Sequence, residues 1–145
     1  DSTILKPGLS TSLFDGEWLV LDAFSGKPVW KRGTNEETNW LCGPVWFEQG
    51  ATDVQVIQKA PVIISGNLEA HTRICDTTGL TATGHLMVVA DCTIDGNTKR
   101  GLKKATGNGQ HNIYAFYVGP GELPGVVGGT DVIRVWIKSP IQITI

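Results

Sequence analysis

Alternation of apolar and polar residues is the dominant pattern of this chain, and it is clearest over 68–75. Leu68, Ala70, Thr72 and Ile74 fall on one face of an extended segment, and Glu69, His71, Arg73 and Cys75 fall on the other. A period of two residues is typical of a β-strand with one face in the core and the other in water. The pattern therefore predicts a strand over 68–75 with Cys75 on its outer face.

The C-terminal half predicts a β-meander. Its strands are expected at 84–89, 112–118 and 131–137, with polar turns between them. Asp95-Gly96 is predicted to be a hairpin turn, because this dipeptide favours the positive φ angles that tight hairpins need.

The last two apolar runs also alternate. The odd-numbered residues of 133–137 are predicted to point inward, and Arg134 and Trp136 outward. The three isoleucines of 141–145 share one face of a further strand. Pro140 is expected to separate the two runs, since proline cannot donate a ladder hydrogen bond.

The N-terminal half predicts a hairpin. The run 17–22 lies between Gly16 and Gly26 and is expected to be the first strand. The segment 27–31 is its predicted partner, and Pro28 places that partner at the edge of a sheet.

No long window has helical spacing, and about ten short strands with frequent turns predict an all-β fold. The expected architecture is a small antiparallel β-sandwich or β-barrel, with a single β domain at 14–145 and an extended N-terminal arm at 1–13. The arm carries isolated apolar residues among Ser, Thr, Pro and Gly, which suits docking on a partner. Its candidate contact residues are Ile4, Leu5 and Leu9.

Charge and hydropathy argue against two classes of partner, nucleic acid and membrane. The chain has 12 basic and 14 acidic residues, a net charge of −2, and no apolar stretch near the roughly 20 residues that span a bilayer. We therefore expect no membrane and no direct nucleic-acid partner. The one basic cluster is predicted to be a solvated hairpin rim, and it comprises Lys99, Arg100, Lys103 and Lys104.

Three cysteines, Cys42, Cys75 and Cys92, stand at wide spacing without the close pairs of zinc sites. Free thiols are the simplest interpretation. An intermolecular disulfide through an outward Cys75 is the alternative, and the spacing leaves the oxidation state open.

No motif predicts catalysis. The chain lacks a Gly-x-Ser-x-Gly turn, and the glycine-rich segments 119–121 and 125–129 lack the Lys-Ser or Lys-Thr of a phosphate loop. We expect a protein that is not an enzyme, with no cofactor and no metal.

Five tryptophans are many for this length, and three of them, Trp30, Trp40 and Trp46, lie near predicted loops or edges. An exposed tryptophan can stack on a sugar or anchor a protein interface. These three residues are therefore candidate interface residues, and they also allow a carbohydrate-binding module or lectin-like domain.

Four segments together resemble capsid decoration (cement) proteins of tailed bacteriophages, or related virion structural proteins. They are Asp15–Asp22 followed by Gly26-Lys27, then Gly84–Val89, Lys103–Gly107 and Val132–Ile137. The likeness is one of hydrophobicity and turns, and the tryptophan-rich segment 40–47 has no counterpart in it.

The resemblance implies a protein on the capsid surface of the virion, assembled in the host cytoplasm. Such proteins bind the major capsid protein and stabilise the head by clamping neighbouring coat subunits, often as homotrimers. A phage tail or head-completion component is a further alternative within the same resemblance.

Overall fold

The computed structural model of this chain describes residues 2–4, 13–24, 26–45, 59–63, 67–123 and 131–145. Within these ranges every regular element is a β-strand, which confirms the predicted all-β class. The strands are β1 (Ser2–Ile4), β2 (Trp18–Phe24), β3 (Lys27–Lys31), β4 (Cys42–Pro44), β5 (Lys59–Pro61), β6 (Leu68–Thr72), β7 (Cys75–Asp76), β8 (Leu86–Ile94), β9 (Asn97–Lys104), β10 (Gln110–Pro120) and β11 (Ile133–Thr144).

The largest sheet has six strands in the order β6-β11-β10-β8-β9-β7. Its neighbours are antiparallel except for the short parallel pair of β7 with β9. Asp95 and Gly96 join β8 to β9 with φ angles of 51° and 80°. Positive φ at both central residues defines a type I′ turn, so the predicted hairpin turn is confirmed.

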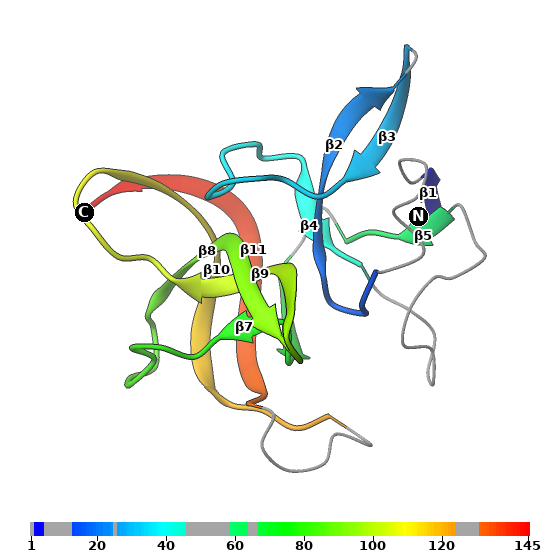
Figure 1. Cartoon of the computed structure of the whole chain (residues 1–145). Helices are drawn as coiled ribbons and strands as arrows, with labels where there is room; N and C mark the ends of the chain where they lie inside the picture. The colour runs from blue at the N-terminus through cyan, green and yellow to red at the C-terminus, as the bar shows by residue number, and fades with distance from the viewer. Residues whose placement is uncertain (1, 5–12, 25, 46–58, 64–66, 124–130) are drawn as a thin grey trace.

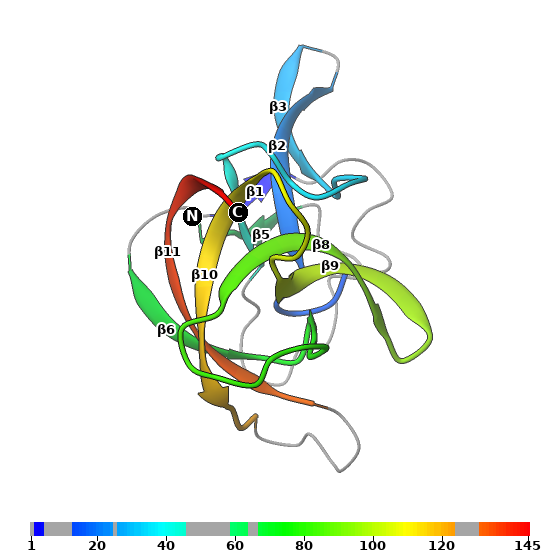
Figure 2. The same cartoon turned by 90° about the vertical axis from the view of Figure 1, so that its left-hand side faces the viewer.

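A smaller sheet has three strands in the order β3-β2-β4. The β2–β3 hairpin extends away from the rest of the molecule (Figures 1 and 2). Pro28 lies in the edge strand β3 and pairs with Ala23, as the sequence predicted. A separate two-stranded sheet pairs β1 with β5.

The main core lies between the small sheet and the large one, which gives a sandwich-like arrangement and no closed barrel. Trp18 of β2 meets Tyr114 of β10 edge to face, with ring centroids 5.8 Å apart. The other buried members of this core are Cys42, Cys75, Met87, Val89, Leu102, Ala115, Ile133, Val135 and Ile137.

The inward and outward faces of β11 agree with the sequence pattern. The odd-numbered residues of 133–137 are buried, and Trp136 is exposed. Pro140, however, does not separate two strands: β11 runs without a break from Ile133 to Thr144. The register with β10 shifts between Ile113 and Ala115, so the ladder has an irregularity near Pro140 that accommodates it.

The strand predicted over 68–75 ends early, at Thr72. The N–H of Ile74 donates to Thr72 Oγ1, and the N–H of Cys75 donates to the carbonyl of Arg73, each at 3.0 Å. The chain then enters β7, where Cys75 is buried. The prediction that Cys75 faces outward is wrong, because the alternation of faces does not continue through this bend.

Gly101 allows β7 to approach β9. A Cβ atom at this position would lie 2.2 Å from the carbonyl oxygen of Ile74. We expect Gly101→Ala to lower the free energy of unfolding by about 1–3 kcal/mol, since overpacking costs that much. Urea unfolding measures the loss. Gly119→Ala is the control, because its Cβ would meet no atom within 4 Å; equal losses for both variants would contradict the close approach.

Candidate functional site

A carboxylate is fully buried where the small sheet meets β9. Glu17, which directly precedes β2, accepts hydrogen bonds from Arg32 Nε, from Arg32 Nη2 at 3.1 Å and from the N–H of Phe14 at 3.1 Å. Lys99 Nζ of β9 lies 3.4 Å from Glu17 Oε1 and 4.0 Å from the centroid of the Phe14 ring. Glu17 thus joins the end of the β2–β3 hairpin to the large sheet.

A second buried charge anchors the loop between β3 and β4. Arg100 Nη1 lies 3.1 Å from Asp91 Oδ1, and Arg100 Nη2 lies 3.5 Å from Glu37 Oε1. Arg100 Nη2 also donates to the carbonyl of Asn35. The guanidinium therefore binds this loop through both a side chain and the backbone.

These contacts correct the prediction for the basic cluster. Glu17, Lys99 and Arg100 are 0%, 4% and 2% exposed, so Lys99 and Arg100 are not part of a solvated rim. Residues 97–104 form a strand of their own, and successive side chains point to opposite faces. Lys99 therefore reaches Glu17 on one side, and Arg100 reaches Glu37 and Asp91 on the other.

The same loop is held against β10 by neutral hydrogen bonds. The Tyr114 hydroxyl donates to the carbonyl of Asn39 at 2.8 Å, and Trp40 Nε1 donates to Asn112 Oδ1 at 3.2 Å. Trp40 nevertheless remains 54% exposed. A hydrogen bond at one end of the indole fixes its position, and much of the side chain is exposed to solvent.

His111 closes this loop on β10 with an ion pair. Its Nδ1 lies 2.6 Å from Glu36 Oε1, and its Nε2 lies 3.0 Å from the carbonyl oxygen of Gly107. The hydrogen bond with Glu36, followed by the one with Gly107, raises the pKa of His111 above its ordinary value of 6.5. Protonation of His111 thus strengthens the attachment of the loop.

The candidate interface residues that the structure describes lie in different surroundings. Trp30 is buried in a cluster with Leu13 and Val45, whereas Trp40 is exposed. Ile4 lies in β1, and Cys75 is in the core. Leu5, Leu9 and Trp46 lie outside the described residues. Of the three candidate tryptophans, the described part of the chain thus offers only Trp40 as an exposed surface.

Leu13 is the last residue of the predicted arm 1–13. Leu13 is fully buried and packs with Leu19, Trp30, Val45 and Val62. The core of the domain therefore already includes the last residue assigned to the arm.

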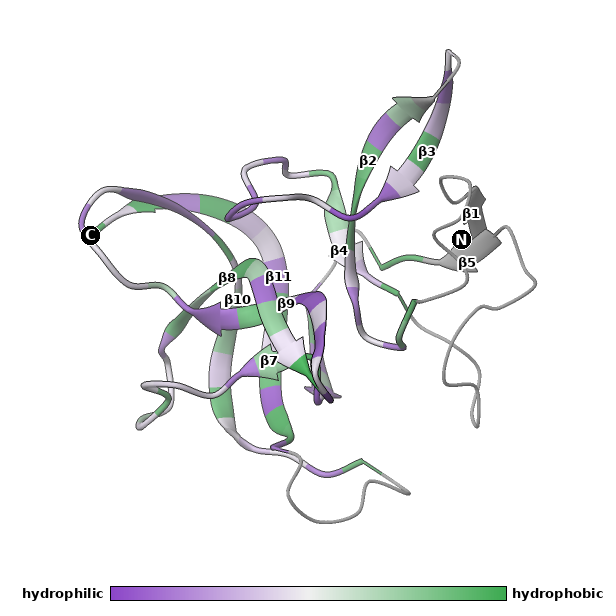
Figure 3. Cartoon of the chain, viewed as in Figure 1, coloured by the Kyte–Doolittle hydropathy of each residue, from purple (hydrophilic) through white to green (hydrophobic). Residues whose placement is uncertain are grey.

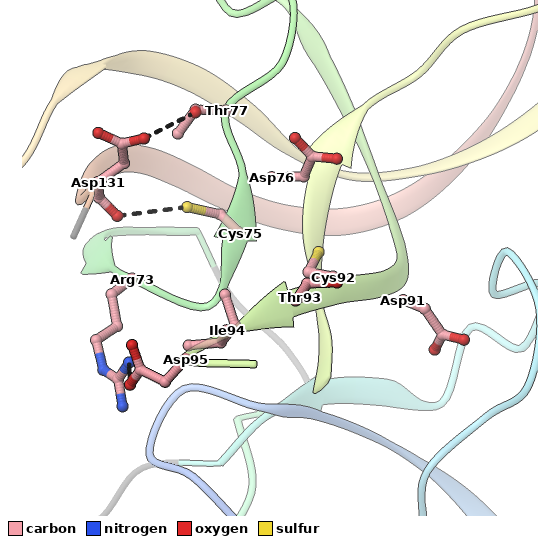
Figure 4. Close-up of a pocket in the computed structure, with 10 residues that line it drawn as sticks. All are labelled: Arg73, Cys75, Asp76, Thr77, Asp91, Cys92, Thr93, Ile94, Asp95 and Asp131. Atoms are coloured by element: carbon pink, nitrogen blue, oxygen red, sulfur yellow. Dashed lines mark hydrogen bonds and ion pairs between the residues drawn. The ribbon is translucent and has the colours of Figure 1, made fainter. Parts of the chain in front are cut away.

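An acidic hollow of about 370 Å³ lies between β7 and the β8–β9 turn (Figure 4). Arg73 binds Asp95 at 2.9 Å, and the Thr77 hydroxyl binds Asp131 at 3.1 Å. Its other carboxylates are Asp76 and Asp91. No group of three or more His, Cys, Asp or Glu side chains within the described ranges is arranged to hold a metal ion.

Two thiols line this hollow but are not activated. Burial is the main cause that raises the pKa of Cys75 to about 12 and that of Cys92 to about 11. Because the thiolate is the reactive form, both side chains are poor nucleophiles at neutral pH.

An apolar hollow of about 440 Å³ opens between the two main sheets. Trp18 and Val45 line it from the side of the small sheet, and Leu68, Val135 and Ile137 from the large one. Glu69 and His71 stand at its polar rim. It is continuous with the main core.

Exposed large apolar side chains concentrate on β11 and on the loop that binds β10. Figure 3 shows apolar and polar bands alternating along β11. Ile141 and Ile145 are 39% and 49% exposed, and Trp136, Trp40 and Leu41 are exposed as well. Sequence periodicity placed the isoleucines on one face, but it did not show that Ile141 and Ile145 are exposed while Ile143 packs against a buried cluster.

No protein-family model matches this chain, and neither does any curated protein or solved structure. Within the described ranges, no helix is long and apolar enough to cross a membrane. The exposed side chains and the free strand edges are therefore the features on which a function can be based.

Loss of the Glu17 charge should destabilise the fold. We expect Glu17→Gln to lower the free energy of unfolding by about 3–5 kcal/mol, since it removes the fully buried charge that pairs with Arg32 and Lys99. Denaturant unfolding measures the change. The control is Asp22→Asn, which removes a solvent-exposed ion pair with Lys31 and should cost no more than about 1 kcal/mol. Similar losses for both variants would contradict the importance of burial.

The His111–Glu36 pair predicts a pH dependence. Because folding raises the pKa of His111 above 6.5, the pair contributes its full stability below pH 6.5 and loses it as the pH rises through the folded pKa. The stability difference between the wild type and Glu36→Gln should therefore be larger at about pH 5.5 than at about pH 9. Thermal unfolding at both values tests this, and a difference that grows with pH would refute the sign.

Proposed function

We propose that this chain is a non-catalytic structural protein of a tailed-phage virion. It binds the major capsid protein on the outer surface of the head and stabilises the head by clamping neighbouring coat subunits. The proposal is supported by the resemblance of the β2–β3 hairpin and the C-terminal meander to decoration proteins. It is also supported by the position of the N-terminal strand.

The observation that carries the proposal is the short pairing of β1 with β5. This strand has three residues, and among the described strands it pairs only with β5, itself three residues long. Figure 1 shows this pair beside the small sheet, away from the meander. A two-stranded pairing of this length is marginal in water, so β1 can leave β5 without disrupting either main sheet.

A released β1 can bind a coat subunit by strand addition. Backbone hydrogen bonds supply most of the affinity in this mode, so the mixed side chains of the arm are tolerated. Leu13, at the C-terminal end of the arm, is fixed to the core because it packs with Leu19 and Trp30. The chain before Leu13 is therefore the tether, and an oligomer carrying several such arms gains about 10²-fold or more in avidity.

The carbohydrate-binding alternative needs at least two of Trp30, Trp40 and Trp46 on one exposed face. Trp30 is buried and Trp40 is exposed. That function would therefore have to use Trp40 together with Trp46, which lies outside the described residues.

Deletion of residues 1–12 tests the proposal and keeps the buried Leu13. We expect a folded domain, judged by near-ultraviolet circular dichroism, that no longer co-sediments with expanded capsids. Trp40→Ala is the matched control, because it removes an exposed aromatic side chain outside the arm and should leave capsid binding intact.

Full capsid binding by the truncated protein would refute the role of the arm. Loss of capsid binding by Trp40→Ala, with binding retained by the truncated protein, would indicate that the loop between β3 and β4 is the docking surface. Binding of the intact chain to isolated tails, and not to heads, would favour the tail-component alternative.

A further inference from the structure

Among the described strands, one edge of β11 has no partner over its C-terminal part. β6 pairs with β11 only from Ile133 to Ile137, and β10 occupies the other side of β11 as far as Thr144. Among the described strands, none pairs with the β6 side of β11 beyond Ile137. Figure 2 shows the red C-terminal part of β11 curving past the end of β6.

The direction of the backbone groups along this edge follows from one pair of hydrogen bonds. Ile145 N–H donates to the carbonyl of Gly109 at 2.8 Å, and Gly109 N–H donates to the carbonyl of Ile145 at 3.0 Å. In an antiparallel ladder such pairs recur at every second residue. Ile141 and Ile143 therefore bond toward β10, whereas the N–H and C=O groups of Gln142 and Thr144 point to the open edge.

Apart from Pro140, the side chains of this edge carry no protection against pairing. The segment Ser139–Ile145 contains no charged residue. Proteins usually guard such edges with charges, which prevent edge-to-edge association. Here Ile141 and Ile145 are 39% and 49% exposed instead. An uncharged edge with exposed β-branched side chains is compatible with an identical edge, since no like charges oppose each other across a two-fold axis.

We propose that two copies of this chain associate by antiparallel pairing of their β11 edges about a two-fold axis. The centre of the interface is Ile143, opposite the same residue of the second copy. Gln142 then faces Thr144 of the second copy, and each of these pairs exchanges two backbone hydrogen bonds. Ile141 faces Ile145, so the isoleucines of both strands form one apolar cluster.

Pro140 selects this register. In the neighbouring register, Gln142 would lie opposite Gln142 of the second copy. Thr144 would then lie opposite Pro140 of the second copy, which has no N–H to donate. The pairing joins the two six-stranded sheets into one. It is independent of capsid attachment through β1, and it predicts a dimer where the phage resemblance implied a trimer.

Light scattering after size exclusion of the full chain tests the association. We expect a mass twice the 15.6 kDa of one chain. Gln142→Pro should shift this mass to that of a monomer, because it removes one edge donor and leaves the ladder with β10 intact. Gln142→Ala keeps the N–H and should remain a dimer. A monomeric or trimeric wild type would overturn the proposal.

Cross-linking tests the register without a proline. We expect Ile143→Cys to form an intermolecular disulfide under mild oxidation, since the two Cβ atoms of a directly opposed pair lie about 4.5–5.5 Å apart. Ile141→Cys is the matched control and should not cross-link, because it faces Ile145. The native cysteines are all buried. Cross-linking of both variants to the same extent, or of neither, would contradict this pairing.

Discussion

The contact on which this fold depends is the buried carboxylate of Glu17 between Arg32 and Lys99. It joins three parts of the chain that are distant in sequence: the start of β2, the end of the β2–β3 hairpin and the middle of β9. A buried ion is tolerated only where opposite charges and hydrogen bonds replace the lost water. The carboxylate therefore has one favourable location, and that location sets how the small sheet meets the large one.

The Arg100 guanidinium has the same role for the loop between β3 and β4. It contacts Glu37 and the backbone of Asn35, while Tyr114 and Asn112 hold the following residues by hydrogen bonds. An irregular loop is thereby given a fixed position beside β10. Its exposed apolar residues, Trp40 and Leu41, stand on this ordered base.

The buried charges of Glu17 and Arg100 are paired inside the domain, whereas two strands at its periphery can still pair with other chains. Among the described strands β1 pairs only with the short β5, and β11 extends beyond the strand that covers its first half. Both strands have backbone groups that can pair with other strands without a demanding side-chain match. In the two proposals made above, the open edge of β11 pairs with a second copy of the chain, and β1 pairs with a different protein.

The sequence by itself determined the all-β class and the buried face of 133–137, because a period of two residues is a local property. It also determined the Asp95-Gly96 turn, since the preferred φ angles of these residues need no distant partner. Only the tertiary structure decided that Lys99, Arg100 and Trp30 are buried and that Cys75 turns into the core. Burial of a cation depends on carboxylates such as Glu17 and Glu37, which are far away in sequence and near only after the sheets have packed.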